Sequence, residues 1–246
     1  MPEIVISAET LFHLGNFPVT NAIVLSMVSF LVLASFGLIF SRKIGMVPGG
    51  FQNLVELAVS GLFDFIDSIF HDKNKTEKYF PLIATVFFFI LISNWLGLFP
   101  GVGSLFLFIE HEGHEIHAPL FRAPASDLNF TLALAIISVI ATNILGVTAI
   151  GFAKHFKKFF TLKSPIDFFV GILEFISEIA KIISFSFRLF GNVFAGEVLL
   201  TIVAFLVPYL IPLPFLFLEI FVGFIQALVF TMLTVVFVGM ATSEHH

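Results

Sequence analysis

Cysteine is absent from this chain of 246 residues, and charged residues make up only 12% of it. Without cysteine the chain can form neither disulfide bonds nor thiolate metal sites. Its 12 Lys and Arg residues are scattered, and the lack of a basic tract argues against nucleic acid as a partner. The N-terminal stretch also lacks a positively charged region before its first apolar run, so we expect no cleaved signal peptide.

Apolar residues dominate what is present. The chain is 58% hydrophobic, contains 36 phenylalanines and has a mean hydropathy of +1.06. Soluble domains are about 45–50% apolar and about 25% charged, so this excess is too large for one buried core. We therefore expect an all-α integral membrane protein, a single membrane domain over residues 1–246 that crosses the lipid bilayer about five times.

Uncharged runs of about 20 residues predict the membrane helices. Apolar residues spaced three and four apart among acidic ones predict an additional amphipathic helix after the first span. Two long helices close the chain, joined by a proline-rich turn. The spans are predicted at 20–40, 79–100, 128–152, 166–207 and 215–242, and the amphipathic helix at 51–71.

The connecting segments predict the orientation. Residues 73–78, 102–127 and 153–164 are predicted as loops. Segment 41–78 contains five Lys and Arg residues and 153–164 contains four, whereas 102–127 contains one. Because basic loops stay on the cytoplasmic side, we expect the N-terminus outside and the C-terminus in the cytoplasm.

Proline is also missing between Pro165 and Pro208. One helix over these 42 residues would be about 63 Å long, about twice the thickness of the hydrocarbon layer. We therefore expect a helix that is strongly tilted, or one that is broken at Gly191 or Gly196.

This long helix contains unusually many polar residues. Residues three, four or seven apart share a helix face, and the spacing predicts one polar stripe. Its members are Glu174, Glu178, Lys181, Arg188 and Asn192.

Glu197 lies nine residues beyond Arg188, about half a turn round the helix and about 13 Å along it. In the last helix Glu219 and Gln226 are seven apart and share a face. An antiparallel arrangement brings Glu219 toward the level of Glu197 and Gln226 toward that of Arg188. Ionisable residues inside a membrane mark ion paths more often than structural contacts, although pairing within the bundle is the alternative.

The string "SFSFRLFGNVFAGE", preceded by "LEFISEIAKII" and followed 38 residues after its Arg by a Gln, resembles subunit a of F-type ATP synthases. The stretches "SNWLGLFPG" and "APASDLNFT" are similar to two earlier signatures of that family. The resemblance extends from about residue 48 to the C-terminus, and the first 47 residues match only as an opening membrane helix.

The resemblance implies a non-catalytic stator subunit that couples ion flow to rotation and ATP synthesis, with no cofactor and no metal. Its partners would be the c-subunit ring and the b subunit of the peripheral stalk, in a bacterial cytoplasmic membrane. Arg188 would face the carboxylates of the ring, with two aqueous half-channels leading there. The implied proton-path residues are Glu197, Glu219, Gln226, Asn192, Glu174 and Ser184.

Other polar residues have simpler interpretations. The sequence "EHEGHEIH" at 110–117 lacks the H-E-x-x-H spacing of metalloproteases, and we expect a solvated loop instead of a metal site. Asp127 is expected to cap a helix, with a position near the outward channel as the alternative. Asn94 and Asn143 are expected to form hydrogen bonds between helices. His245 and His246 are given no role.

Two other classes of protein are less consistent with the sequence. A secondary transporter would be expected to show inverted repeats with broken helices, and no such repeat is visible. An intramembrane hydrolase would need catalytic side chains within the spans, whereas all His residues lie in predicted loops or near the ends. The choice between H⁺ and Na⁺ is left open, because it depends mainly on the ring.

Overall fold

The computed structural model describes residues 7–99, 101–102, 105–111, 114–157, 165–207 and 210–242. Six long helices account for most of this part of the chain, and five of them are long and apolar enough to cross a membrane. The expected all-α membrane fold is confirmed. The long helices are α1 (Asn21–Lys43), α2 (Gly50–Phe70), α3 (Lys73–Gly97), α4 (Leu128–Ile150), α6 (Pro165–Leu206) and α7 (Pro212–Thr242).

Several segments predicted as loops are structured. Residues 73–78 are the first turns of α3, because the Asp72 carboxylate accepts hydrogen bonds from the backbone N–H groups of Asn74 and Lys75, as a helix N-cap does. Short elements also interrupt the other two loops. They are η2 (Pro124–Ser126), α5 (Phe152–Lys157), and the hairpin of β3 (Phe106–His111) and β4 (His114–Pro119).

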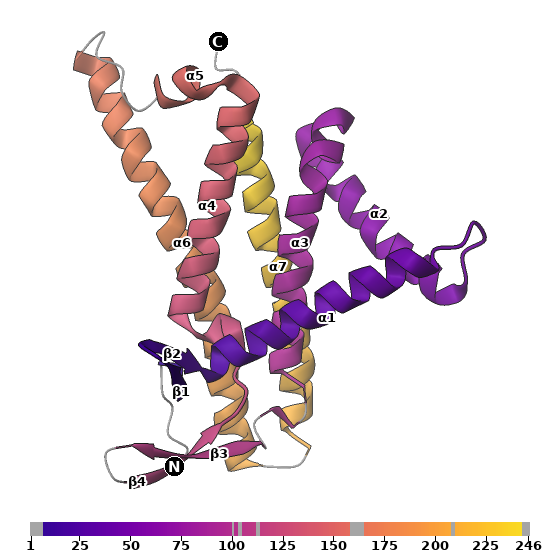
Figure 1. Cartoon of the computed structure of the whole chain (residues 1–246), viewed down its shortest axis with the longest axis vertical. Coiled ribbons are helices and arrows are strands. Elements are labelled where there is room, and N and C mark those ends of the chain that lie inside the picture. Colours follow the sequence, from indigo (N-terminus) through magenta and orange to yellow (C-terminus); the bar gives the residue numbers. More distant parts are fainter. Residues whose placement is uncertain are drawn as a thin grey trace.

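A second antiparallel hairpin, β1 (Thr10–Leu14) with β2 (Phe17–Thr20), precedes α1. Both hairpins lie at the same end of the molecule, opposite α5 and the C-terminus (Figure 1). At the hairpin end, the Asp127 carboxylate caps α4 by accepting a hydrogen bond from the N–H of Asn129 at 3.0 Å. The expected capping role of Asp127 is thus confirmed.

Helices α3, α4, α6 and α7 pack together and bury most of the core. Phe185 of α6 packs on Phe230 of α7 with a distance of 4.8 Å between ring centroids. The hydroxyl groups of Thr131 on α4 and Ser186 on α6 are 3.1 Å apart and both side chains are buried. Such small polar pairs let helices approach closely in a lipid environment.

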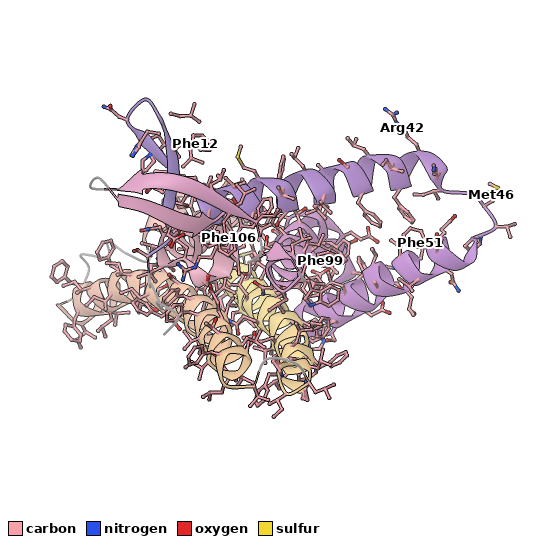
Figure 2. All side chains as sticks on the ribbon, turned by 90° about the horizontal axis from the view of Figure 1, so that it is seen from below. Phe12, Arg42, Met46, Phe51, Phe99 and Phe106 are labelled. Carbon is pink, nitrogen blue, oxygen red and sulfur yellow. The ribbon has the colours of Figure 1, made fainter. Side chains whose placement is uncertain are left out.

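Helices α1 and α2 form an arm beside this bundle. α1 crosses one face of the bundle obliquely. α2 then runs back to the start of α3, at the end of the molecule where the C-terminus of the chain lies (Figure 1). In the view along the other axis, Arg42 and Met46 lie near the tip of the arm (Figure 2). Phe36 of α1 meets Phe51 of α2 edge-on at 6.2 Å, and α2 turns the buried Leu62 and Ile66 toward the bundle.

The long helix α6 contains 42 residues and continues through both Gly191 and Gly196. It is therefore not broken at either glycine. At about 1.5 Å per residue it runs nearly the whole length of the bundle, antiparallel to the long helix α7. The two helices form the hairpin that carries most of the candidate site (Figure 1).

Candidate ion-translocation site

Two separate cavities open along the α6–α7 hairpin, one toward each end of the molecule. The larger has a volume of 540 Å³ and lies toward α5; we name it the Arg188 cavity. The smaller has a volume of 270 Å³ and lies toward the β-hairpins; we name it the Glu219 cavity. α6 contributes to the walls of both.

Arg188 is half-buried on α6, at the inner end of the Arg188 cavity. One of its terminal nitrogens donates a hydrogen bond to the Ser184 hydroxyl, one turn earlier, at 3.3 Å. The apolar neighbours Ile183 and Phe187 are more than half exposed, so this face of α6 is not covered by the described part of the chain. A guanidinium keeps its proton in such surroundings, so Arg188 is a fixed positive charge.

The expected polar stripe leads into this cavity. Polar side chains from about four turns of α6 line one wall, and residues of α4, α5 and α7 line the others. The residues from α6 with polar side chains are Glu174, Ser177, Glu178, Lys181, Ser184 and Arg188.

A chain of hydrogen bonds crosses the wall of the Arg188 cavity. The Lys181 ammonium donates to one carboxylate oxygen of Glu178 at 2.7 Å, and the Asn143 amide donates to the other at 3.2 Å. The Asn143 amide oxygen lies 3.0 Å from Nε2 of His155. The expected interhelical hydrogen bond of Asn143 is therefore present, and it joins α4 to both α6 and α5.

Asn192 and Gln226 connect the hairpin helices between the two cavities. The Asn192 amide donates a hydrogen bond to the Gln226 side-chain oxygen at 2.7 Å. Gln226 is 3% exposed, and its own amide nitrogen has no hydrogen-bond partner among the described residues. Gln226 thus meets Asn192, one turn from Arg188, at the level on α6 that the antiparallel arrangement predicts.

The Glu219 cavity places Glu219 and Glu197 on one wall, from α7 and α6 respectively. Glu219 is only 6% exposed and its carboxylate lies against Gly196, where a Cβ atom would occupy the same space. Asn94 of α3 lines the cavity too, and its amide donates to the carbonyl of Gly223 on α7 at 3.2 Å. This is the interhelical bond expected of Asn94.

Arg122 is the residue of this cavity that sequence reasoning missed. Its guanidinium is 8% exposed, pairs with Glu197 at 3.4 Å and donates to the backbone carbonyl of Ser7 at 2.9 Å and to Ser126 at 3.1 Å. The sequence signal for Arg122 was that it is the single Lys or Arg of segment 102–127 and comes shortly before the helix cap at Asp127. The second carboxylate oxygen of Glu197 is buried and has no hydrogen-bond partner among the described residues.

The site residues divide between the two cavities as follows. Arg188, Ser184 and Glu174 line one, Glu197 and Glu219 line the other, and the Asn192–Gln226 pair lies between them. Among the described residues no cluster has the composition of a metal site. The side chains of the His- and Glu-rich loop 110–117 lie outside the described residues.

Buried ionisable groups face two cavities that do not meet, so the polar path through the molecule is interrupted. This arrangement is typical of multi-pass membrane proteins that translocate ions. The ATP synthase A chain family model matches residues 23–239. ATP synthase subunit a of Syntrophobacter fumaroxidans is 35% identical over 245 residues, covering 98% of this chain and 92% of the relative. That of Gloeobacter violaceus is 37% identical over 228 residues, covering 92% of this chain and 85% of the relative.

The chain therefore belongs to the ATP synthase A chain family, the proton-conducting stator of the membrane sector F0. The catalysis of ATP synthesis resides in F1, and this subunit is a multi-pass membrane protein of a bacterial-type ATP synthase.

Proposed function

We propose that the two cavities are offset half-channels and that the positive charge of Arg188 prevents protons from passing directly from one to the other. The observation that carries the proposal is their arrangement along α6. One cavity contains Arg188 and the other contains Glu219 with Glu197. The hydrogen-bonded pair of Asn192, which is exposed, and Gln226, which is buried, lies between them. A proton that fills one cavity then reaches the other only by way of a partner that moves.

The partner that fits this arrangement is the ring of c subunits, whose carboxylates would pass the uncovered face of α6. A guanidinium attracts an ionised carboxylate but does not deprotonate. Arg188 would therefore favour proton release from an arriving ring carboxylate and would block a direct leak between the cavities. Ser184 would hold the guanidinium through its hydrogen bond at 3.3 Å.

Glu219 and Glu197 would pass protons between the aqueous phase and the ring on the hairpin side, with Asn192 and Gln226 at the inner limit of that path. Glu174 would line the path on the α5 side. The buried polar atoms of Glu197, Asn94 and Gln226 that lack a hydrogen-bond partner in the described part of the chain are groups that water molecules would satisfy.

The basic segments support a position of α5 and the C-terminus on the cytoplasmic side of a bacterial membrane. The β-hairpins and the Glu219 cavity would then face outward. The arm of α1 and α2 leaves apolar side chains such as Leu54 and Leu57 exposed, which suits lipid and the membrane helix of a b subunit in the peripheral stalk.

Replacing the charge tests the proposal. Arg188→Ala in the assembled complex should abolish ATP-driven acidification of vesicles, and Arg188→Lys should also fail or leak because a lysine can lose its proton when desolvated. Arg42→Ala is the matched control, since Arg42 is exposed at the end of α1. Acidification at the rate of the unchanged protein in Arg188→Ala would refute the proposed role.

A further inference from the structure

His155 is buried beside the Arg188 cavity although it comes from a short helix after α4. Gly151 ends α4 with a φ of 87°, a conformation that glycine adopts readily, and this turn folds α5 back onto α4. The ring of His155 is 1% exposed and lies against Gly146, where a Cβ atom would be 2.7 Å from Cε1 and 2.8 Å from Nδ1. The chain thus provides a closely fitted site for this ring.

The hydrogen bonds around Asn143 show which ring nitrogen of His155 is the donor. The Asn143 amide nitrogen donates both to the backbone carbonyl of Val139 at 2.9 Å and to Glu178 at 3.2 Å. Its amide oxygen can only accept, so Nε2 of His155 must carry the proton in the contact at 3.0 Å. The imidazole, together with these two acceptors, therefore holds the amide in the orientation that places its nitrogen on Glu178.

Glu178 and Lys181 form a mostly buried pair, with side chains 15% and 17% exposed. Lys181 is seven residues before Arg188 on the same face of α6, about 10 Å along the helix. At the effective dielectric constant of about 20 that is typical near a protein surface, an uncompensated charge at that distance would change a proton-transfer rate by about tenfold. Holding Glu178 against Lys181 cancels that charge.

We propose that His155 is a positioning residue of the proposed cytoplasmic half-channel: through Asn143 it holds the Glu178 carboxylate on Lys181, so that Lys181 adds no uncompensated positive charge beside Arg188 in the cavity. This rests on the proposed function of the Arg188 cavity. His155 lines this cavity as well, but its effect on Glu178 passes through the amide of Asn143.

Passive proton flux through F0 in vesicles stripped of F1 tests the inference. His155→Phe fills the site but donates no hydrogen bond, and it should lower the flux by about tenfold. His155→Gln retains a donor that can reach Asn143 and should restore most of the flux. Equal flux in His155→Phe and the unchanged protein would overturn the proposal, as would equal losses in the Phe and Gln variants.

A double variant distinguishes a positioning role of His155 from a role in packing alone. Glu178→Gln should itself lower the flux, and adding His155→Phe to it should cause no further loss, because His155 acts through Glu178. A further loss in the double variant, multiplying the two single effects, would overturn the proposal. If His155→Phe does not accumulate in the membrane, Asn143→Ala breaks the same chain and is expected to give the same two results.

A failure of the role of His155 can be distinguished from a failure of the proposed function. The role of Arg188 is measured by ATP-driven acidification in Arg188→Ala, whereas the role of His155 is measured by its dependence on Glu178 in passive flux. A dependence on Glu178 together with normal pumping by Arg188→Ala would refute only the role of Arg188.

Discussion

The carboxylate of Glu219 on α7 occupies the space that a side chain would need at Gly196 on α6. The position of a buried carboxylate on one helix is thus set by the absence of a side chain on its neighbour. Small residues commonly let membrane helices approach closely. Here the missing Cβ accommodates an ionisable group at the wall of a cavity.

Gly196→Ala should therefore displace the Glu219 carboxylate without harming the fold. The obstructing atoms belong to the flexible end of a side chain, and alanine favours a helix over glycine by up to about 1 kcal/mol. We expect normal assembly but a loss of about tenfold in proton flux, because small displacements of reacting groups are costly. Gly37→Ala, where a Cβ meets nothing within 4 Å, is the control, and normal flux in Gly196→Ala would contradict the expectation.

The Asn192–Gln226 hydrogen bond should limit proton leak between the two cavities more than it stabilises the fold. Interhelical hydrogen bonds in membrane proteins contribute on average about 0.6 kcal/mol, so Gln226→Ala should change the thermal stability of the membrane sector little. It should nevertheless raise the proton leak of vesicles that hold inhibited enzyme, because water can occupy the vacated space. Thr234→Ala, a buried α7 residue that bonds within its own helix at 2.9 Å, should leave the leak unchanged; an equal leak in both variants would argue against the barrier.

Arg122 should stabilise the hairpin end of the molecule. Removing one partner of a buried pair leaves an uncompensated charge, although the side chain of Glu197 is 38% exposed and solvent reduces the cost to about 1 kcal/mol. Arg122→Ala should therefore lower the melting temperature of the purified membrane sector modestly and free the N-terminal segment for limited proteolysis. Arg122→Lys should retain only part of the effect, since a lysine lacks the fork that contacts Ser7, Ser126 and Glu197. Unchanged proteolysis in Arg122→Ala would count against this role.

The attachment of the N-terminal segment should depend on pH through Glu9. Burial raises the pKa of the Glu9 carboxyl above its ordinary value of 4.5, and the charge of Arg122 opposes part of this increase. Because the folded pKa is the higher one, the stabilisation is fully present below pH 4.5 and is lost as the pH rises through the folded pKa.

Hydrogen exchange at the backbone N–H of Asn21, which donates to the carbonyl of Glu9 at 3.1 Å, measures this attachment. Its protection factor should fall as the pH rises above 4.5. Glu9→Gln should remove the dependence and keep the protection high. A protection factor that is independent of pH in the unchanged protein would exclude the effect.

The sequence predicted the all-α fold and its five membrane spans because each span is a long apolar run that lipid favours irrespective of its neighbours. It also predicted the face of α6 that lines the Arg188 cavity and the level at which α7 meets it, since both follow from helical geometry alone. The beginning of α3 was missed because the polar run at 73–78 resembles a loop, and its helical state depends on the cap at Asp72.

Contacts between distant segments could not be predicted in this way. The pairing of Arg122 with Glu197 joins the loop before α4 to the middle of α6, and the hydrogen bond of His155 depends on a turn at Gly151 that reverses the chain. Neither has a periodic signal in the sequence. They arise from packing, which one sequence without its structure does not reveal.

The continuity of α6 has a mechanical consequence. Because a single unbroken helix forms walls of both cavities, the angle between their openings is set by the number of residues that separate them. Each residue added or removed between Arg188 and Glu197 would rotate one opening by about 100° relative to the other. In the proposed mechanism, the number of residues in this part of α6 would therefore set how far the ring turns between taking up a proton and releasing it.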